Sequence, residues 1–154
     1  MRRKLSALAA AIALLGLTIS IISPASSDTR YHHRTLHLTD KASDDRDDFV
    51  DVGEQGESVG DYLVIDRDPI FDASRSEKVG EATGDCLSLR TLFECDVTFK
   101  LRGGLITFEG PVSFEEETSR LAVTGGTGAY KTAHGTVTVT GSEEGLDLVL
   151  RLLL

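Results

Sequence analysis

The sequence contains no tryptophan, three prolines, one methionine and two cysteines among its 154 residues. So few prolines, together with 15 scattered glycines, exclude collagen-like and proline-rich chains. Basic residues are also scarce, 16 against 25 acidic ones, so the formal net charge is −9. A surface of this sign repels phosphate backbones, and we therefore expect no nucleic-acid partner. The length and a hydrophobic content of 40% predict one folded domain.

Long apolar runs are also absent, except for one at the N-terminus. Three basic residues at positions 2–4 precede the uncharged and mostly apolar stretch from Leu5 to Ile22, and small residues follow Pro24. This order is typical of a secretory signal peptide, so we predict that residues 1–27 are removed. The run is also long enough to span a bilayer, which leaves an uncleaved anchor as the alternative. In both cases we expect the domain outside the cytoplasm, with no membrane contact after cleavage.

Residues 28–60 form a polar N-terminal segment. Arg34–Thr39 alternates well enough to predict one strand. The acidic stretch Asp40–Asp48 follows, and we expect a solvated loop there. Its carboxylates are calcium-type ligands, but their spacing lacks the order of a hand-type calcium loop. We therefore predict neither a metal site nor a cofactor.

Residues 61–154 form the main part of the domain and are predicted to be strands throughout. Short runs rich in Val, Thr, Leu and Phe alternate with glycines, which is typical of all-β domains. The predicted strands are Asp61–Asp66, Lys78–Leu89, Phe93–Arg102, Leu105–Phe114, Arg120–Thr124, His134–Gly141 and Leu146–Leu153. With the strand before residue 40, eight strands favour closure into a single antiparallel β-barrel that can hold a small ligand. A sandwich is the alternative architecture.

The two cysteines fall on neighbouring predicted strands. If Lys78–Leu89 and Phe93–Arg102 form a hairpin that turns around residues 90–91, residues whose numbers sum to 181 face each other. Cys86 and Cys95 satisfy this condition, so a cross-strand disulfide is within reach. An exported protein is expected to oxidise such a pair, and an oxidised Cys86 cannot act as a catalytic thiol.

Four motifs occur in a fixed order between Asp61 and Leu152. They are Gly60-Asp61 with the strand running to Ile70-Phe71-Asp72, Val79-Gly80-x-x-x-Gly84-x-Cys86, Gly104-x-Ile106-x-x-x-Gly110-Pro111, and Ala122-Val-Thr-Gly-Gly-Thr-Gly-Ala-Tyr130. This order resembles the allene oxide cyclase and dirigent superfamily of small β-barrels, and its bacterial secreted relatives in particular. The glycine-rich last motif is by itself best explained as a tight strand connection.

The resemblance implies an eight-stranded barrel with a mostly apolar cavity, often assembled as a trimer. Plant cyclases of this kind close a ring in an unstable epoxide fatty acid, and dirigent proteins guide the coupling of phenolic radicals. By this resemblance the protein is a secreted isomerase-like or dirigent-like barrel that binds an apolar, reactive small molecule. It would steer cyclisation or coupling by holding the molecule in one shape. The alternative is a non-catalytic secreted or envelope-associated binding protein on the same barrel.

The resemblance also points to candidate site residues. The catalytic glutamate of the plant cyclases falls near His37, where we expect an exposed strand histidine. The polar clamp of the cyclases falls at Asp66, Arg67 and Asp68, and dirigent proteins use aspartates in this neighbourhood. These three residues are the catalytic candidates near the mouth of the barrel, with Tyr62 as a ligand-binding candidate.

Glu109 and Phe108 complete the set of candidates. Glu109 shares a strand face with Leu105 and Thr107, so it would be a cavity acid if that face points inward. Strand facing is not determined by alternation alone. Phe108 is the second ligand-binding candidate. The three glutamates at 115–117 are expected to form a solvated turn.

The signal-peptide hypothesis predicts a mature chain that begins at Asp28. When the full chain is expressed in a secreting host, the exported protein should have the mass of residues 28–154, because signal peptidase cuts after small residues. Intact-mass measurement and N-terminal sequencing check this, and a Ser27→Leu variant should keep the segment. Wild-type protein that retains residues 1–27 in the membrane fraction would establish the anchor instead.

Overall fold

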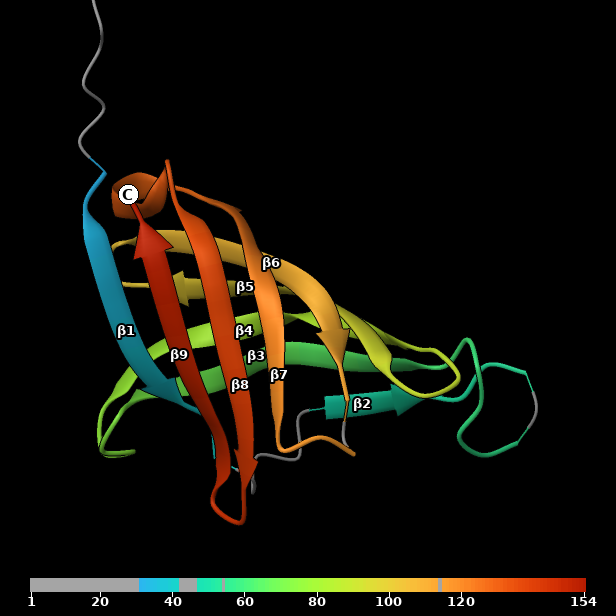
Figure 1. Ribbon diagram of the computed structural model, residues 1–154. Coiled ribbons are helices and arrows are strands. Elements are labelled where there is room, and N and C mark those ends of the chain that lie inside the picture. The colour runs from blue at the N-terminus through green and yellow to red at the C-terminus, as the bar shows by residue number, and fades with distance from the viewer. Residues whose placement is uncertain (1–30, 42–46, 54, 114) are drawn as a thin grey trace, which may run out of the picture.

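A single antiparallel sheet, closed on itself, forms the protein (Figure 1). The computed structural model describes residues 31–41, 47–53, 55–113 and 115–154, so the expected signal peptide and most of the acidic stretch lie outside the described residues. The strands are β1 (His33–Thr39), β2 (Asp47–Val50), β3 (Tyr62–Asp72), β4 (Lys78–Ser88), β5 (Phe93–Leu101), β6 (Gly104–Val112), β7 (Thr118–Gly126), β8 (His134–Ser142) and β9 (Gly145–Leu153). A short 3-10 helix, η1 (Gly128–Tyr130), precedes β8. Within the described residues, no helix is long and apolar enough to span a membrane.

Pairing between β1 and β3 closes the barrel. The strand order is β1-β9-β8-β7-β6-β5-β4-β3, and Leu38 and Thr39 of β1 pair with Asp72 and Phe71 of β3. The Thr39 hydroxyl also donates a 3.0 Å hydrogen bond to the Asp72 carbonyl oxygen. Eight strands therefore form a closed antiparallel barrel, which confirms the predicted fold class. The sandwich alternative is excluded.

The ninth strand, β2, is an addition to the barrel that the sequence analysis missed. It pairs with the first half of β3. The same edge of β3 pairs with β1 near the C-terminal end of the strand. Its residues, Asp47–Val50, include the end of the acidic stretch that we expected to be a loop. That expectation was wrong for these residues, because the free edge of β3 supplies hydrogen-bonding partners that composition does not reveal.

Large apolar side chains fill one end of the barrel. Ile106, Val137, Leu150 and Leu152 are at most 1% exposed. The helix η1 lies across this end, next to the C-terminus (Figure 1), and its Tyr130 is buried. This end is therefore a packed core.

The glycine-rich motif before η1 allows this cap to approach the sheet closely. The amide of Ala129 donates a 2.8 Å hydrogen bond to the Gly103 carbonyl oxygen. A Cβ at Gly104, whose φ is +138°, would collide with the Thr127 carbonyl oxygen. The glycines thus form a tight strand connection, because a side chain at Gly104 would hold the cap away from β6.

Asp61, the residue directly before β3, anchors the connection that leads into this strand. Its side chain is fully buried and accepts hydrogen bonds from the amide of Val52, at 2.7 Å, and from the amide and hydroxyl of Ser58. The Val52 hydrogen bond is the main reason that the pKa of Asp61 is lowered. The carboxylate thereby holds the connection between β2 and β3 against the barrel.

Asp72 organises the turn between β3 and β4 in the same way. Its carboxylate accepts hydrogen bonds from the Ser74 hydroxyl at 2.6 Å and from the amides of Ser76 at 2.9 Å and Glu77 at 3.1 Å. These bonds, the Ser74 bond foremost, lower the pKa of Asp72 to about 2. A carboxylate whose pKa is lowered by folding stabilises the folded state fully at every pH above its pKa in the unfolded chain.

We expect Asp72→Asn to lower the melting temperature at pH 7, because the amide cannot accept these bonds as a charged group does. The Asp72 carboxylate contributes fully above its unfolded pKa of roughly 3.9 and loses that contribution as the pH falls toward 2. The difference between wild type and variant should therefore shrink between pH 4 and pH 2. Thermal unfolding followed by circular dichroism measures this, and a difference that is constant over that interval would contradict the assignment.

Candidate functional site

The end of the barrel opposite η1 is hollow. A cavity of about 740 Å³ opens there, between the β6–β7 and β8–β9 turns. Its walls are mainly apolar and come from the seven strands β3 to β9, with Leu63, Ile65, Ile70, Ala82, Val97, Phe99, Phe108, Val112, Leu121, Val139 and Leu148 in the apolar lining. This volume lies within the range of small-molecule sites, and the mixture of apolar walls with a few polar groups is typical of them.

The disulfide lies in the wall of this cavity. Cys86 of β4 and Cys95 of β5 are paired directly in the register, and their sulfur atoms are bonded. Both residues are buried and line the cavity. The predicted hairpin register and the predicted disulfide are confirmed, so Cys86 is not available as a thiol. The bond is also consistent with an oxidising compartment.

A β-bulge in β3 decides which of the clamp residues reaches the cavity. The pairing with β4 shifts between Asp66 and Asp68, and the residue between them, Arg67, has a φ of +63°. Before the bulge Ile65 faces inward, and after it Asp68 does, so the inward positions change from odd to even numbers. In a regular strand Arg67 would face the cavity instead of Asp68.

Asp68 is the acidic group deepest in the cavity wall. It is 6% exposed, and it lies on β3 between Ile65 and Ile70, which also line the cavity. Its neighbour across the sheet is Ala82, which leaves open space in front of it. A carboxyl group in such a setting can transfer a proton to or from an atom of a bound molecule.

The other candidates from this part of the sequence, two clamp residues and Tyr62, lie outside the cavity. Asp66 and Arg67 are exposed, and Tyr62 is 39% exposed at the start of β3. Tyr62 pairs with Val50 of β2 and does not line the cavity. Of the three polar residues at 66–68, the structure brings only Asp68 into the barrel.

Glu109 also lies outside the barrel. We expected it to be a cavity acid if its face of the strand pointed inward, and this face points outward. The register with β5 places Ile106 and Phe108 inward, so Glu109 between Phe108 and Gly110 is exposed on the outer face. Phe108 is buried and lines the cavity, where its ring packs edge-to-face on Phe99 with centroids 4.7 Å apart. Alternation along β6 was identified correctly, but only the packed barrel shows which face is inside.

Acidic side chains surround the mouth of the cavity. The residues of the mouth with ionisable side chains are Asp40, which follows β1, and Glu115, Glu116 and Glu117 of the β6–β7 turn. Ser113, Ser119 and Ser142 add hydroxyl groups. The three glutamates are exposed, as expected for a turn, but the expectation of a merely solvated turn missed their place beside the cavity. Nothing local in the run of three glutamates indicates that this turn lies beside a cavity.

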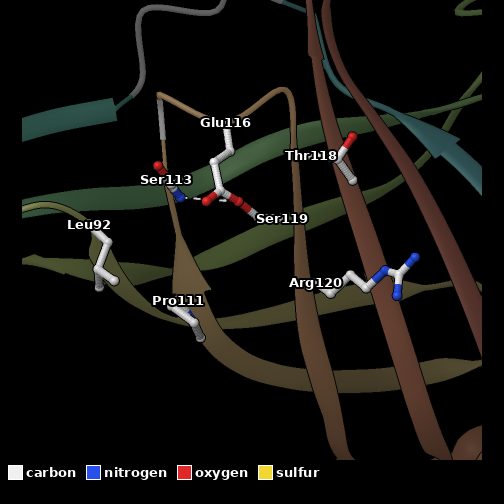
Figure 2. A pocket seen from close by; sticks show the side chains of 7 residues that line it. All are labelled: Leu92, Pro111, Ser113, Glu116, Thr118, Ser119 and Arg120. Atoms are coloured by element: carbon white, nitrogen blue, oxygen red, sulfur yellow. Dashed lines mark hydrogen bonds between the residues drawn. The ribbon is translucent and has the colours of Figure 1, made fainter.

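A second hollow, of about 490 Å³, lies beside the mouth on the outside of the β6–β7 hairpin. Figure 2 shows its side chains, with Ser113 and Ser119 joined by a 3.1 Å hydrogen bond from the Ser113 amide. Leu92 and Pro111 lie on one side, and the guanidinium of Arg120 points away from them (Figure 2). Because these groups do not converge on one point, the barrel cavity is the better candidate site.

Nothing in the described part of the chain gathers three or more His, Cys, Asp or Glu side chains around a common point for a metal ion. The described side chains of the cavity offer apolar confinement, the phenyl rings of Phe99 and Phe108, and the inward carboxyl group of Asp68.

Comparison with known proteins agrees with this geometry. The family model described as "Dirigent-like protein" matches residues 31–152. Among solved structures, a pyocyanin demethylase is 25% identical with a TM-score of 0.64, over 79% of this chain and 99% of that chain. An exo-specific intermolecular Diels–Alderase is 18% identical with a TM-score of 0.65, over 81% of this chain and 99% of that chain. A pterocarpan synthase dirigent protein is 19% identical with a TM-score of 0.57, over 80% of this chain and 83% of that chain.

The two structures below 25% identity support the fold alone. No curated protein sequence matches the chain at a significant level.

The bulge predicts an unusual response to substitution at Arg67. Glycine adopts a φ of +63° without strain, whereas a β-branched residue is strongly disfavoured there. Arg67→Val should therefore be less stable than Arg67→Gly by roughly 1 kcal/mol, although both remove the guanidinium. Urea unfolding of the two variants measures the difference. Equal stabilities would mean that residue 67 does not occupy the left-handed region.

Proposed function

Because the chain belongs to the dirigent-like family, we propose that it is a secreted barrel that binds an apolar, reactive small molecule and steers its cyclisation or coupling. The observation that carries this proposal is the hollow half of the barrel, about 740 Å³ with apolar walls and one inward carboxyl group. Two of the proteins with a similar fold, a Diels–Alderase and a pterocarpan synthase dirigent protein, are named for bond-forming reactions, which supports bond formation as the reaction class. A trimer, implied by the family resemblance, stays a prediction.

The proposed mechanism is confinement. Apolar walls fold a flexible molecule into one conformation and keep water away, so that its reacting atoms meet in one orientation. The Phe99–Phe108 pair offers flat surfaces against which an unsaturated or aromatic group can pack. The disulfide ties two strands of the wall together, which keeps the shape of the cavity constant. Asp68 is the residue proposed to exchange a proton with the bound molecule.

The remaining candidates take different roles in this proposal. Phe108 contacts the ligand, whereas Asp66 and Arg67 position Asp68 through the bulge that they form. Tyr62 and Glu109, on the outer surface, take no part in the reaction.

A non-catalytic binding protein is the second candidate function. Two or more ionisable groups deep in the cavity would favour chemistry, and a fully apolar lining would favour binding alone. Among the residues that the structure describes, one such group is present, Asp68, and the other lining carboxylates belong to the mouth. The two functions therefore differ in one measurable property, the effect of the protein on the products formed from a bound molecule.

Ligand binding in the cavity can be tested with the neutral apolar fluorophore Nile red. Ala82 lines the cavity and Ala122 is exposed on β7, so Ala82→Phe and Ala122→Phe add the same side chain inside and outside the barrel. We expect Ala82→Phe to raise the Kd for Nile red at least about tenfold, because it removes apolar contact volume. Ala122→Phe should leave the Kd unchanged. Similar Kd values for both folded variants would place binding outside the cavity and contradict the proposal.

Steering is tested by product stereochemistry. Coniferyl alcohol radicals made by a laccase should couple with an excess of one enantiomer when the protein is present, and chiral chromatography measures this excess. The excess should disappear with Ala82→Phe and persist with Ala122→Phe. A racemic product in the presence of protein that still binds Nile red would support the binding protein instead.

A further inference from the structure

Charge is distributed unevenly around the cavity. Among the described residues, each ionisable side chain in the cavity lining is a carboxylate: Asp40, Asp68, Glu115, Glu116 and Glu117. No lysine, arginine or histidine of the described ranges occurs in that lining. A cavity built for a carboxylate-bearing molecule would be expected to hold at least one such cation.

Nearby cations in the described chain have other contacts. The Nζ atom of Lys41 lies 4.0 Å from the centroid of the Phe71 ring. Arg75, close to the β8–β9 turn, forms ion pairs with Asp147 at 3.1 Å and Glu144 at 3.6 Å. Arg120 belongs to the outer hollow and extends away from Pro111 there (Figure 2). None of these described cations belongs to the cavity lining, so the ionisable groups of that lining are carboxylates.

We propose that the cavity selects ligands with a positively charged group on an apolar, ring-containing body, and that it disfavours carboxylate-bearing ligands such as fatty acids. This inference rests on the proposed function, because it names the substrate class of the same cavity.

Two physical effects favour such a ligand. A concave mouth with one sign of charge and low-dielectric walls focuses its potential, so cations are concentrated there and anions are repelled. Further inside, Phe99 and Phe108 line the cavity, and an organic cation that meets the face of an aromatic ring is attracted by the negative part of its quadrupole. The apolar walls exclude a bare metal ion or a polyamine as the best ligand, because neither offers surface to bury.

The ligand class can be tested with three probes of one shape: N-methylacridinium as the cation, acridine as the neutral molecule and acridine-9-carboxylate as the anion. At pH 8 and low ionic strength, fluorescence titration of the mature protein should give the lowest Kd for the cation and the highest for the anion. We expect a ratio of at least about tenfold between these two, decreasing as salt is added.

Two triple variants locate the origin of the selectivity. Glu115→Gln, Glu116→Gln and Glu117→Gln together remove three charges from the mouth, and should reduce the cation-to-anion ratio to within about threefold. Asp85→Asn, Glu94→Gln and Asp96→Asn together remove three charges from the outer face of β4 and β5, where these residues are exposed. The second variant should keep the wild-type ratio. Circular dichroism and thiol counting confirm that both variants are folded and oxidised.

The possible results separate this inference from the function on which it rests. Equal binding of the three probes, with Nile red bound as expected, would overturn charge selection and leave ligand binding in the cavity intact. A ratio that survives in the mouth variant, or that falls equally in both variants, would also overturn it. Failure to bind Nile red as well as the acridines would overturn the proposed function and this inference together.

Discussion

The structure depends on the closing pairs between β1 and β3. An open sheet of eight strands would leave unpaired backbone groups at both edges, and closure replaces those edges by hydrogen bonds. The closing contact is short, with Leu38 and Thr39 opposite Asp72 and Phe71. It forms only because β3 continues past its bulge to Asp72, where the turn bound by this carboxylate begins. The ring shape, the inside and the outside of the protein all follow from this contact.

The bulge therefore serves two purposes. It bends β3 so that its second half reaches β1, and it changes the residues of β3 that face inward. The position of Asp68 in the wall is a consequence of the backbone conformation of Arg67, a residue that does not itself line the cavity.

One end of the barrel is packed and the other end is hollow. At the η1 end, Ile106 and Leu150 are fully buried and the interior is packed, and this apolar burial stabilises the fold. At the other end about 740 Å³ is left open, and packing contacts are lost there. The Cys86–Cys95 disulfide crosses the wall of the open half, where a covalent link can offset the missing contacts.

The sequence by itself determined the features that depend on local alternation and on distances along the chain. The all-β class, the register that joins Cys86 to Cys95, and the alternation along β6 are of this kind, because two-residue periodicity and hairpin geometry are local. Tertiary structure alone decided that Phe108 rather than Glu109 faces the cavity, since the same alternation fits both faces. It also decided the pairing of β2, the inward turn of Asp68 and the place of the glutamates beside the mouth. Each of these depends on which distant strands meet when the barrel closes, and no local pattern contains that information.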